Sequence, residues 1–388
     1  MAWLVCLAAA FALGCASNKP PAHQLTGDVI TDGEYAIEHG PEKDRVLWHY
    51  RVALAAMRRG QFDLAKQHLD SAIARISNIY GKDESARKAR GYFAAEAKKT
   101  FIGEPYERAM AYFYRGILYW RDGEPDNMRA CLRSALLMDS DTEDKTYSGD
   151  YVLFDYLDGY ITERLHGDGA DAIKRAQAEA RMWRPPDFPL AANVMVFVDY
   201  GPGPHKYATG QYAEELRFRG GKSPVVSARV TTAGIVGKAV PYDDLLFQAT
   251  TRGGRAMDHV LGNKAVFKRT TDTAGTAAII AGAVTATSGN RNAQMAGLAL
   301  VGAGLITKMF SSAATPQADV RMWDNLPLYL SFVALELPPG PHTLTIEFLD
   351  AQERVVSNFT RVVQVTVPEV PQDTVVYVSD TSITPQTL

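Results

Sequence analysis

Apolar and small residues recur at helical spacing through the first half of the chain. Two sets of such residues share the same spacing of three or four positions: Ala65, Leu69 and Ala72, and then Met128, Leu132 and Ala135. A period of this length lines one apolar stripe along a helix, which can then pack against a neighbour. The pattern predicts a helical region over residues 43–184.

The second half of the chain carries the patterns of strands. Pro185 and Pro186 end the helical region because proline cannot continue a helix. Residues 193–200 are almost all apolar, which predicts a strand that is buried on both faces. Residues 342–348 alternate between polar and apolar side chains, which predicts a strand with one buried face.

Turn residues separate these short strands at intervals of about 8–12 residues, which is typical of β-sandwiches. We therefore expect a β-rich, sandwich-like domain over residues 185–380, followed by a C-terminal tail at residues 381–388. The predicted fold class is α+β and multidomain, with the helical region first.

Glycines divide the helical region into pairs of helices. Ala53 lies seven positions before Gly60, and Gly116 lies seven positions before Gly123. A weaker third copy places Gly167 at the turn. This arrangement resembles the tetratricopeptide repeat, in which two antiparallel helices are joined by a turn that glycine accommodates. The resemblance implies a curved stack of helices.

The concave face of such a stack usually holds a peptide or a partner protein. Tyr112, Tyr119 and Trp120 crowd one helix and are the candidate partner surface. Two alternatives stay open. The helices could only support the rest of the chain, and aromatic residues at helical spacing could belong to its core.

The N-terminus carries a short apolar run at residues 4–15. A run of about 12 residues is too short to span a bilayer and fits the apolar region of a secretory signal. Its end, Ala12-Leu13-Gly14-Cys15, resembles a bacterial lipobox, which implies a lipidated mature N-terminus at Cys15. Residues 16–42 lack an apolar period and are expected to be a flexible tether. A plain cleaved signal and an accidental apolar start are the alternatives.

A segment rich in glycine and alanine, residues 273–310, interrupts the β-rich domain. Its two arms are expected to be helices, each too short to cross the hydrocarbon core of a bilayer. Three alternatives stay open for this hairpin: packing on the sheet, an oligomer contact, or membrane insertion. For the oligomer contact, the candidate seam is Gly297, Gly302 and Gly304, because small residues allow close helix contact.

Composition narrows the classes of function. The net charge of −3 gives no support for nucleic-acid binding, which usually calls for a basic surface. Once Cys6 is removed with the signal and Cys15 is acylated, Cys131 is the one remaining cysteine, so no intrachain disulfide can form. We interpret Cys131 as a small buried residue.

The sequence lacks the motifs of common catalytic and metal sites. Gly221-Lys222-Ser223 resembles the end of a phosphate-binding loop, but Leu216 stands where its first glycine is needed. We therefore expect no enzymatic activity, no cofactor and no metal.

Three stretches resemble a family of bacterial envelope lipoproteins with tetratricopeptide-like repeats: residues 103–110, 199–206 and 318–327. The resemblance implies a location in the envelope and names no catalytic residue. The first stretch also predicts a helix start at Pro105, since Glu104 and Glu107 lie near the positive end of that helix.

The third stretch has its own physical interpretation. Asp319, Arg321 and Trp323 alternate as on one face of a strand. We expect Arg321 to form a structural ion pair, either with Asp319 or with a carboxylate on a helix.

Together these observations predict an outer-membrane-anchored periplasmic lipoprotein that acts as a protein–protein interaction scaffold in an envelope assembly. Its expected partners are the membrane, through Cys15, and other envelope proteins or peptides, through the helical repeats. A structural subunit of an oligomeric ring or pore-like outer-membrane complex is the alternative, which makes the chain a possible homo-oligomer. An envelope hydrolase is a weaker alternative.

Overall fold

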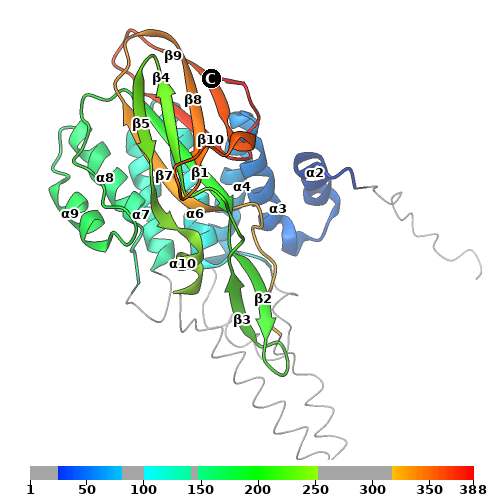
Figure 1. Ribbon diagram of the computed structural model, residues 1–388. Helices are drawn as coiled ribbons and strands as arrows, with labels where there is room; N and C mark the ends of the chain where they lie inside the picture. The colour runs from blue at the N-terminus through cyan, green and yellow to red at the C-terminus, as the bar shows by residue number, and fades with distance from the viewer. Residues whose placement is uncertain (1–24, 81–99, 141–146, 252–316) are drawn as a thin grey trace, which may run out of the picture.

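The computed structural model describes residues 25–80, 100–140, 147–251 and 317–388 (Figure 1). These residues form eight α-helices and three β-sheets, with most helices in the N-terminal half and the strands in the C-terminal half. The α+β class is therefore confirmed. The hairpin predicted at residues 273–310 lies outside the described residues.

The helices have the following bounds: α2 Val29–His39, α3 Arg45–Arg58, α4 Phe62–Tyr80, α6 Pro105–Arg121, α7 Pro125–Asp139, α8 Val152–Arg164, α9 Ala170–Glu179 and α10 Leu245–Thr250. Three successive pairs pack together: α3 with α4, α6 with α7, and α8 with α9. Two short 3₁₀ helices, Glu42–Asp44 and Ser357–Phe359, lie between the other elements.

Glycine accounts for two of the three turns within these pairs. Gly60 and Gly123 have φ angles of 72° and 85°, which is a conformation that other residues adopt at a cost. In the third pair the predicted Gly167 does not take this role, since the preceding His166 adopts the positive φ of 62°. Gly167 lies in the turn of the third pair, between α8 and α9, as predicted, but the left-handed residue there is His166.

Part of the predicted tether is a packed helix. Residues 29–39 form α2, which contacts α3 and whose N-terminus is capped by the Asp28 side chain. Gly33 lies so close to Val52 that a Cβ atom there would be 2.3 Å from the Val52 Cγ2 atom. The flexible tether predicted for residues 16–42 is therefore wrong for this part, because Ile30 and Ile37 give α2 an apolar side and Gly33 between them allows close approach to α3.

The strands have the following bounds: β1 Val194–Pro202, β2 His205–Thr209, β3 Glu215–Arg219, β4 Ser227–Thr232, β5 Ile235–Ala239, β6 Pro241–Asp244, β7 Pro327–Leu335, β8 Gly340–Leu349, β9 Arg361–Val367, β10 Thr374–Ser379 and β11 Gln386–Thr387. Sheet 1 has the strand order β10-β1-β7-β6, and sheet 2 has the order β11-β9-β8-β4-β5. β2 and β3 form a separate two-stranded sheet that extends away from the others (Figure 1).

β1 lies between the helices and sheet 2 and is buried over all but its last residue. Its side chains alternate between two cores. Met195 and Phe197 belong to a core that also contains residues of the helices, whereas Val196 and Val198 belong to a core shared with sheet 2. The prediction of a strand buried on both faces is confirmed.

Sheet 1 covers one side of the helical layer. α3 and α6 contact β10, and α8 contacts β6 and β7. In Figure 1 α6 and α7 lie behind the strands of the two large sheets. The side of these helices that faces sheet 1 is therefore filled by the chain itself and offers no free groove there.

The C-terminal tail is docked on both regions. Gln386 lies in β11, which pairs in parallel with β9. The backbone N–H of Ile383 and the side-chain amide of Gln386 both donate to the carbonyl oxygen of Arg58, at 2.9 and 3.0 Å. Residues 381–388 thus join the end of α3 to sheet 2.

Candidate functional site

The predicted site residues are distributed between the core and segments outside the described residues. Cys15 and the glycines Gly297, Gly302 and Gly304 lie outside them. Tyr112 is half-buried and packs on the helical core. Tyr119 is also half-buried, with the Arg115 guanidinium carbon 3.6 Å from its ring centroid.

Trp120 does not lie on an accessible surface. It is only 1% exposed, and its ring lies edge-on to Phe197 of β1. Its indole N–H donates to the Asp373 carboxylate at 2.9 Å. The assignment of Trp120 to a partner surface is therefore corrected, since sheet 1 covers the helix face from which this side chain projects.

The three stretches that carry the family resemblance meet at one junction between the helices and the strands. Glu107 comes from the first stretch and is fully buried in the first turn of α6. Its carboxylate accepts hydrogen bonds from the backbone N–H of Glu104 and of Trp323, both at 2.7 Å. The predicted helix start at Pro105 is confirmed. Glu107 caps that start and also binds the backbone of the third stretch at Trp323.

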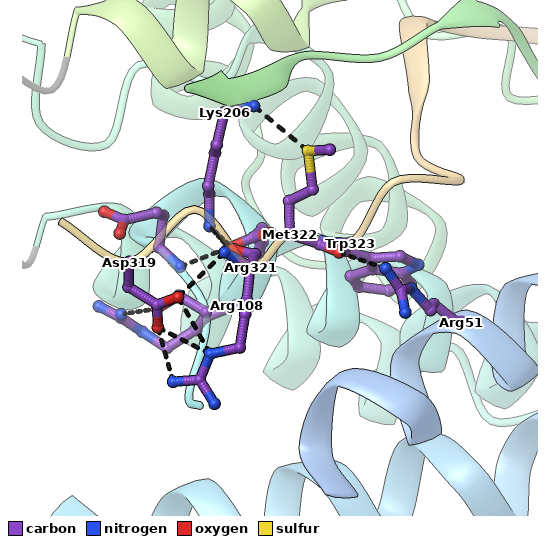
Figure 2. A network of polar contacts seen from close by, with 10 residues as sticks. Arg51, Arg108, Lys206, Asp319, Arg321, Met322 and Trp323 are labelled. Atoms are coloured by element: carbon purple, nitrogen blue, oxygen red, sulfur yellow. Dashed lines mark hydrogen bonds and ion pairs between the residues drawn. The ribbon is translucent and has the colours of Figure 1, made fainter. Parts of the chain in front are cut away.

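Lys206 of the second stretch provides the charge that balances Glu107. Its Nζ atom lies 2.5 Å from the Glu107 Oε2 atom, and both side chains are at most 2% exposed. The same ammonium donates to the carbonyl oxygen of Arg321 at 3.0 Å. Figure 2 shows Lys206 extending from β2 towards Arg321 and Met322. One buried ion pair thereby joins α6, β2 and the third stretch.

Arg321 extends the junction to the start of the helical layer. Its guanidinium donates to Asp319 at 2.6 Å and to Asp44 at 2.5 Å, so both predicted kinds of carboxylate partner are present. The segment from Asp319 to Trp323 is not a strand, however, since β7 begins at Pro327. Its backbone is held by Glu107 and Lys206 instead of by a strand ladder. We call Glu107, Lys206, Asp319 and Arg321 the junction cluster.

A second polar cluster is buried where α6 crosses sheet 1. The hydroxyl groups of Tyr114 and Tyr377 each donate to the Asp199 Oδ2 atom at 2.7 Å. Burial raises the pKa of Asp199, while the nearby Arg58 charge and the two hydroxyl groups oppose that rise. Burial also raises the pKa of both tyrosines, so they remain hydroxyl donors.

The cavity beside Asp199 has a volume of about 10 Å³ and is lined mainly by apolar side chains such as Phe113 and Ile117. This volume is about the space of a single water molecule. A substrate does not fit there, so the Asp199 cluster is a packed polar network within the core.

The charged groups of the junction cluster satisfy one another, which is typical of a structural site. Among the described residues, no group of three or more His, Cys, Asp or Glu side chains is arranged to hold a metal ion. Within that same part of the chain, every helix is too short or too polar to span a bilayer. Lys206 was not predicted as a site residue from the sequence. The signal that could have identified it is its position in the second of the three stretches that carry the family resemblance, residues 199–206.

Comparisons of this chain with protein-family models, with curated proteins and with solved structures gave no match.

Proposed function

We propose that this chain is an outer-membrane-anchored periplasmic lipoprotein that acts as a protein–protein interaction scaffold in an envelope assembly. The apolar run at residues 4–15 and the lipobox-like end at Cys15 support the anchor and the location. The junction cluster is the main observation behind the scaffold role, because its buried ion pair and hydrogen bonds attach the chain to the helices just after the segment 252–316 ends.

The other end of that segment is also attached to the folded part. α10 precedes it, with Asp244 capping its first turn. Gln248 of α10 donates to Asp150 at 3.1 Å, and the Arg181 guanidinium carbon lies 4.2 Å from the Phe247 ring centroid. A segment whose two flanks are fixed in this way suits presentation to a partner, because less ordering entropy is lost on binding.

We further propose that the helix pairs are tetratricopeptide-like and that sheets 1 and 2 form a sandwich-like domain. The repeated Gly60 and Gly123 turns and the core shared by the two sheets support these assignments. Since sheet 1 covers one side of the helical layer, the partner would bind the opposite side of these helices or the segment at residues 273–310.

The anchor is tested by expressing the full-length chain in a Gram-negative host and separating membranes from soluble protein. Cys15→Ala should release the protein from the membrane fraction and abolish incorporation of a labelled fatty acid. Cys131→Ala is the matched control and should stay in the membrane fraction. Unchanged membrane association and labelling of the Cys15 variant would refute the anchor.

The scaffold role is tested on the lipidated protein extracted in mild detergent. Light scattering should give the mass of a monomer, and chemical cross-linking in cells should join the chain to a second protein in fixed stoichiometry. A closed homo-oligomer would instead establish the alternative, a structural subunit of a ring or pore-like complex.

The glycine-rich sequence of residues 273–310 favours that alternative, with Gly297, Gly302 and Gly304 as its proposed seam. Under it, Gly302→Leu should abolish self-association. Thr343→Leu, which adds the same apolar side chain at an exposed position of sheet 2, is the control and should leave self-association unchanged.

A further inference from the structure

Two buried histidines meet between the helices of the first pair. His49 lies on α3 and His68 on α4, and they are 7% and 6% exposed. Their Nδ1 atoms are 2.9 Å apart, which is a hydrogen-bond distance. None of the interactions described above uses this contact.

The contact fixes where the protons lie. A hydrogen bond between two ring nitrogens needs one N–H donor and one bare acceptor, so the two neutral rings must be opposite tautomers. The Nε2 atom of His68 lies 3.9 Å from the Glu34 carboxylate. That carboxylate favours a proton on His68 Nε2, which leaves His68 Nδ1 as the acceptor and His49 Nδ1 as the donor.

We propose that the His49–His68 contact is a proton-sensitive contact that holds α3 against α4 and opens when both rings are protonated. A single added proton leaves the hydrogen bond intact. The protonated ring donates to the neutral ring, which takes the tautomer with a bare Nδ1 atom. A second proton leaves two N–H groups and two positive charges facing each other at 2.9 Å.

The charged groups around the pair do not relieve this repulsion at His49. Glu34 on α2 faces His68. Glu42, in the 3₁₀ helix before α3, favours the charged form of His49, but less than each of the two arginines opposes it. It is also engaged by Arg75 of α4 at 2.5 Å and by Arg45 of α3. The two arginines add positive charge beside His49.

The pKa values agree with this geometry. Burial, followed by the charges of His68, Arg75 and Arg45, lowers the pKa of His49 to about 4. Burial also lowers the pKa of His68, and Glu34 partly opposes that shift. Since these folded-state pKa values lie below the unfolded value of 6.5, the pair stabilises the fold fully above about pH 6.5. That contribution is lost as the pH falls towards 4.

Another buried group hides this dependence in a global unfolding curve. Burial raises the pKa of Asp243 to about 7, against the opposing hydrogen bonds from the N–H groups of Leu153 and Val152. Its contribution to stability is greatest at acid pH and falls as the pH rises towards 7. The test of the histidine pair therefore needs a local measurement.

Hydrogen–deuterium exchange of the full-length chain in mild detergent provides that measurement at pH 6.5 and 4.5. After correction for intrinsic exchange, protection of α3 and α4 should fall about tenfold or more relative to β8. His49→Asn, which keeps a neutral polar group at the Nδ1 position, should abolish that fall. His39→Asn removes an exposed histidine of α2 and should behave as the wild type. An equal loss of protection in His49→Asn and the wild type would overturn the proposal.

A second measurement needs no substitution. Nitrogen-15 spectra of histidine-labelled wild-type protein at pH 7.5 should contain one buried ring protonated at Nδ1 and one protonated at Nε2. Two buried rings that are both Nε2-protonated would overturn the proposal. So would marked protection of α3 and α4 by added zinc sulfate at pH 7, since the pair would then be a metal site.

Discussion

Breaking the ion pair between Glu107 and Lys206 should have the largest effect of any single change in the junction cluster. Lys206→Met keeps the carbon stem of the lysine but leaves the fully buried Glu107 carboxylate with two backbone N–H donors and no counter-charge. Removing one partner of a buried pair costs about 3–5 kcal/mol. Glu107→Gln should cost a similar amount, because it leaves the Lys206 ammonium uncompensated.

The double variant Glu107→Gln, Lys206→Met tests whether the two single costs come from one shared ion pair or from two independent packing defects. It contains no buried charge at this point, so its cost should fall below the sum of the single costs by about 1–3 kcal/mol. Urea unfolding followed by tryptophan fluorescence measures all three values. At a slope of about 3 kcal/mol per molar urea, each single variant should shift the midpoint by about 1 M or more.

An exposed ion pair provides the matched control. Lys238 and Glu353 lie 2.7 Å apart with side chains that are 46% and 70% exposed. Lys238→Met should therefore cost less than about 1 kcal/mol. Single variants of Glu107 or Lys206 that cost no more than this control, or a double variant whose cost is additive, would refute the reasoning.

Two other changes test the core. Tyr377→Phe removes a 2.7 Å hydrogen bond to the buried Asp199 carboxylate and should cost about 1.5–3 kcal/mol in a thermal melt, whereas Tyr207→Phe on the exposed side of β2 should cost nothing measurable. Gly116→Ala places a Cβ atom 2.4 Å from the Met128 sulfur and should cost about 1–3 kcal/mol. An unchanged melting temperature for Gly116→Ala would mean that Met128 moves aside without strain.

Local chemistry made some elements predictable from the sequence. Pro105 with Glu104 and Glu107 is a helix start whose physics is contained in a few adjacent residues, and the structure has α6 begin there. The apolar run of β1 predicted burial on both faces because a strand alternates its side chains. In both cases the prediction needed no knowledge of what lies across the fold.

Contacts between distant residues were the part that sequence could not give. Glu107 and Lys206 are 99 positions apart, and neither position alone indicates the other. Arg321 was expected on a strand, but side chains of α6 and β2 hold its segment instead. The alternation of Asp319, Arg321 and Trp323 was therefore not a sign of a strand. α2 was missed because its apolar side is short, with Ile30 and Ile37 seven positions apart and Gly33 between them at the contact with α3.

The position of β1 also constrains how the chain reaches its native state. Val196 of β1 pairs with Val376 of β10 on one side and with Val333 of β7 on the other. These pairings join residues separated by more than a hundred positions, and loops of that length close slowly. Until residues 374–379 are available, β1 has an unpaired apolar edge of the kind that recruits other chains into aggregates. Loss of β10 should therefore cause aggregation, since within the described residues this strand covers that edge of β1.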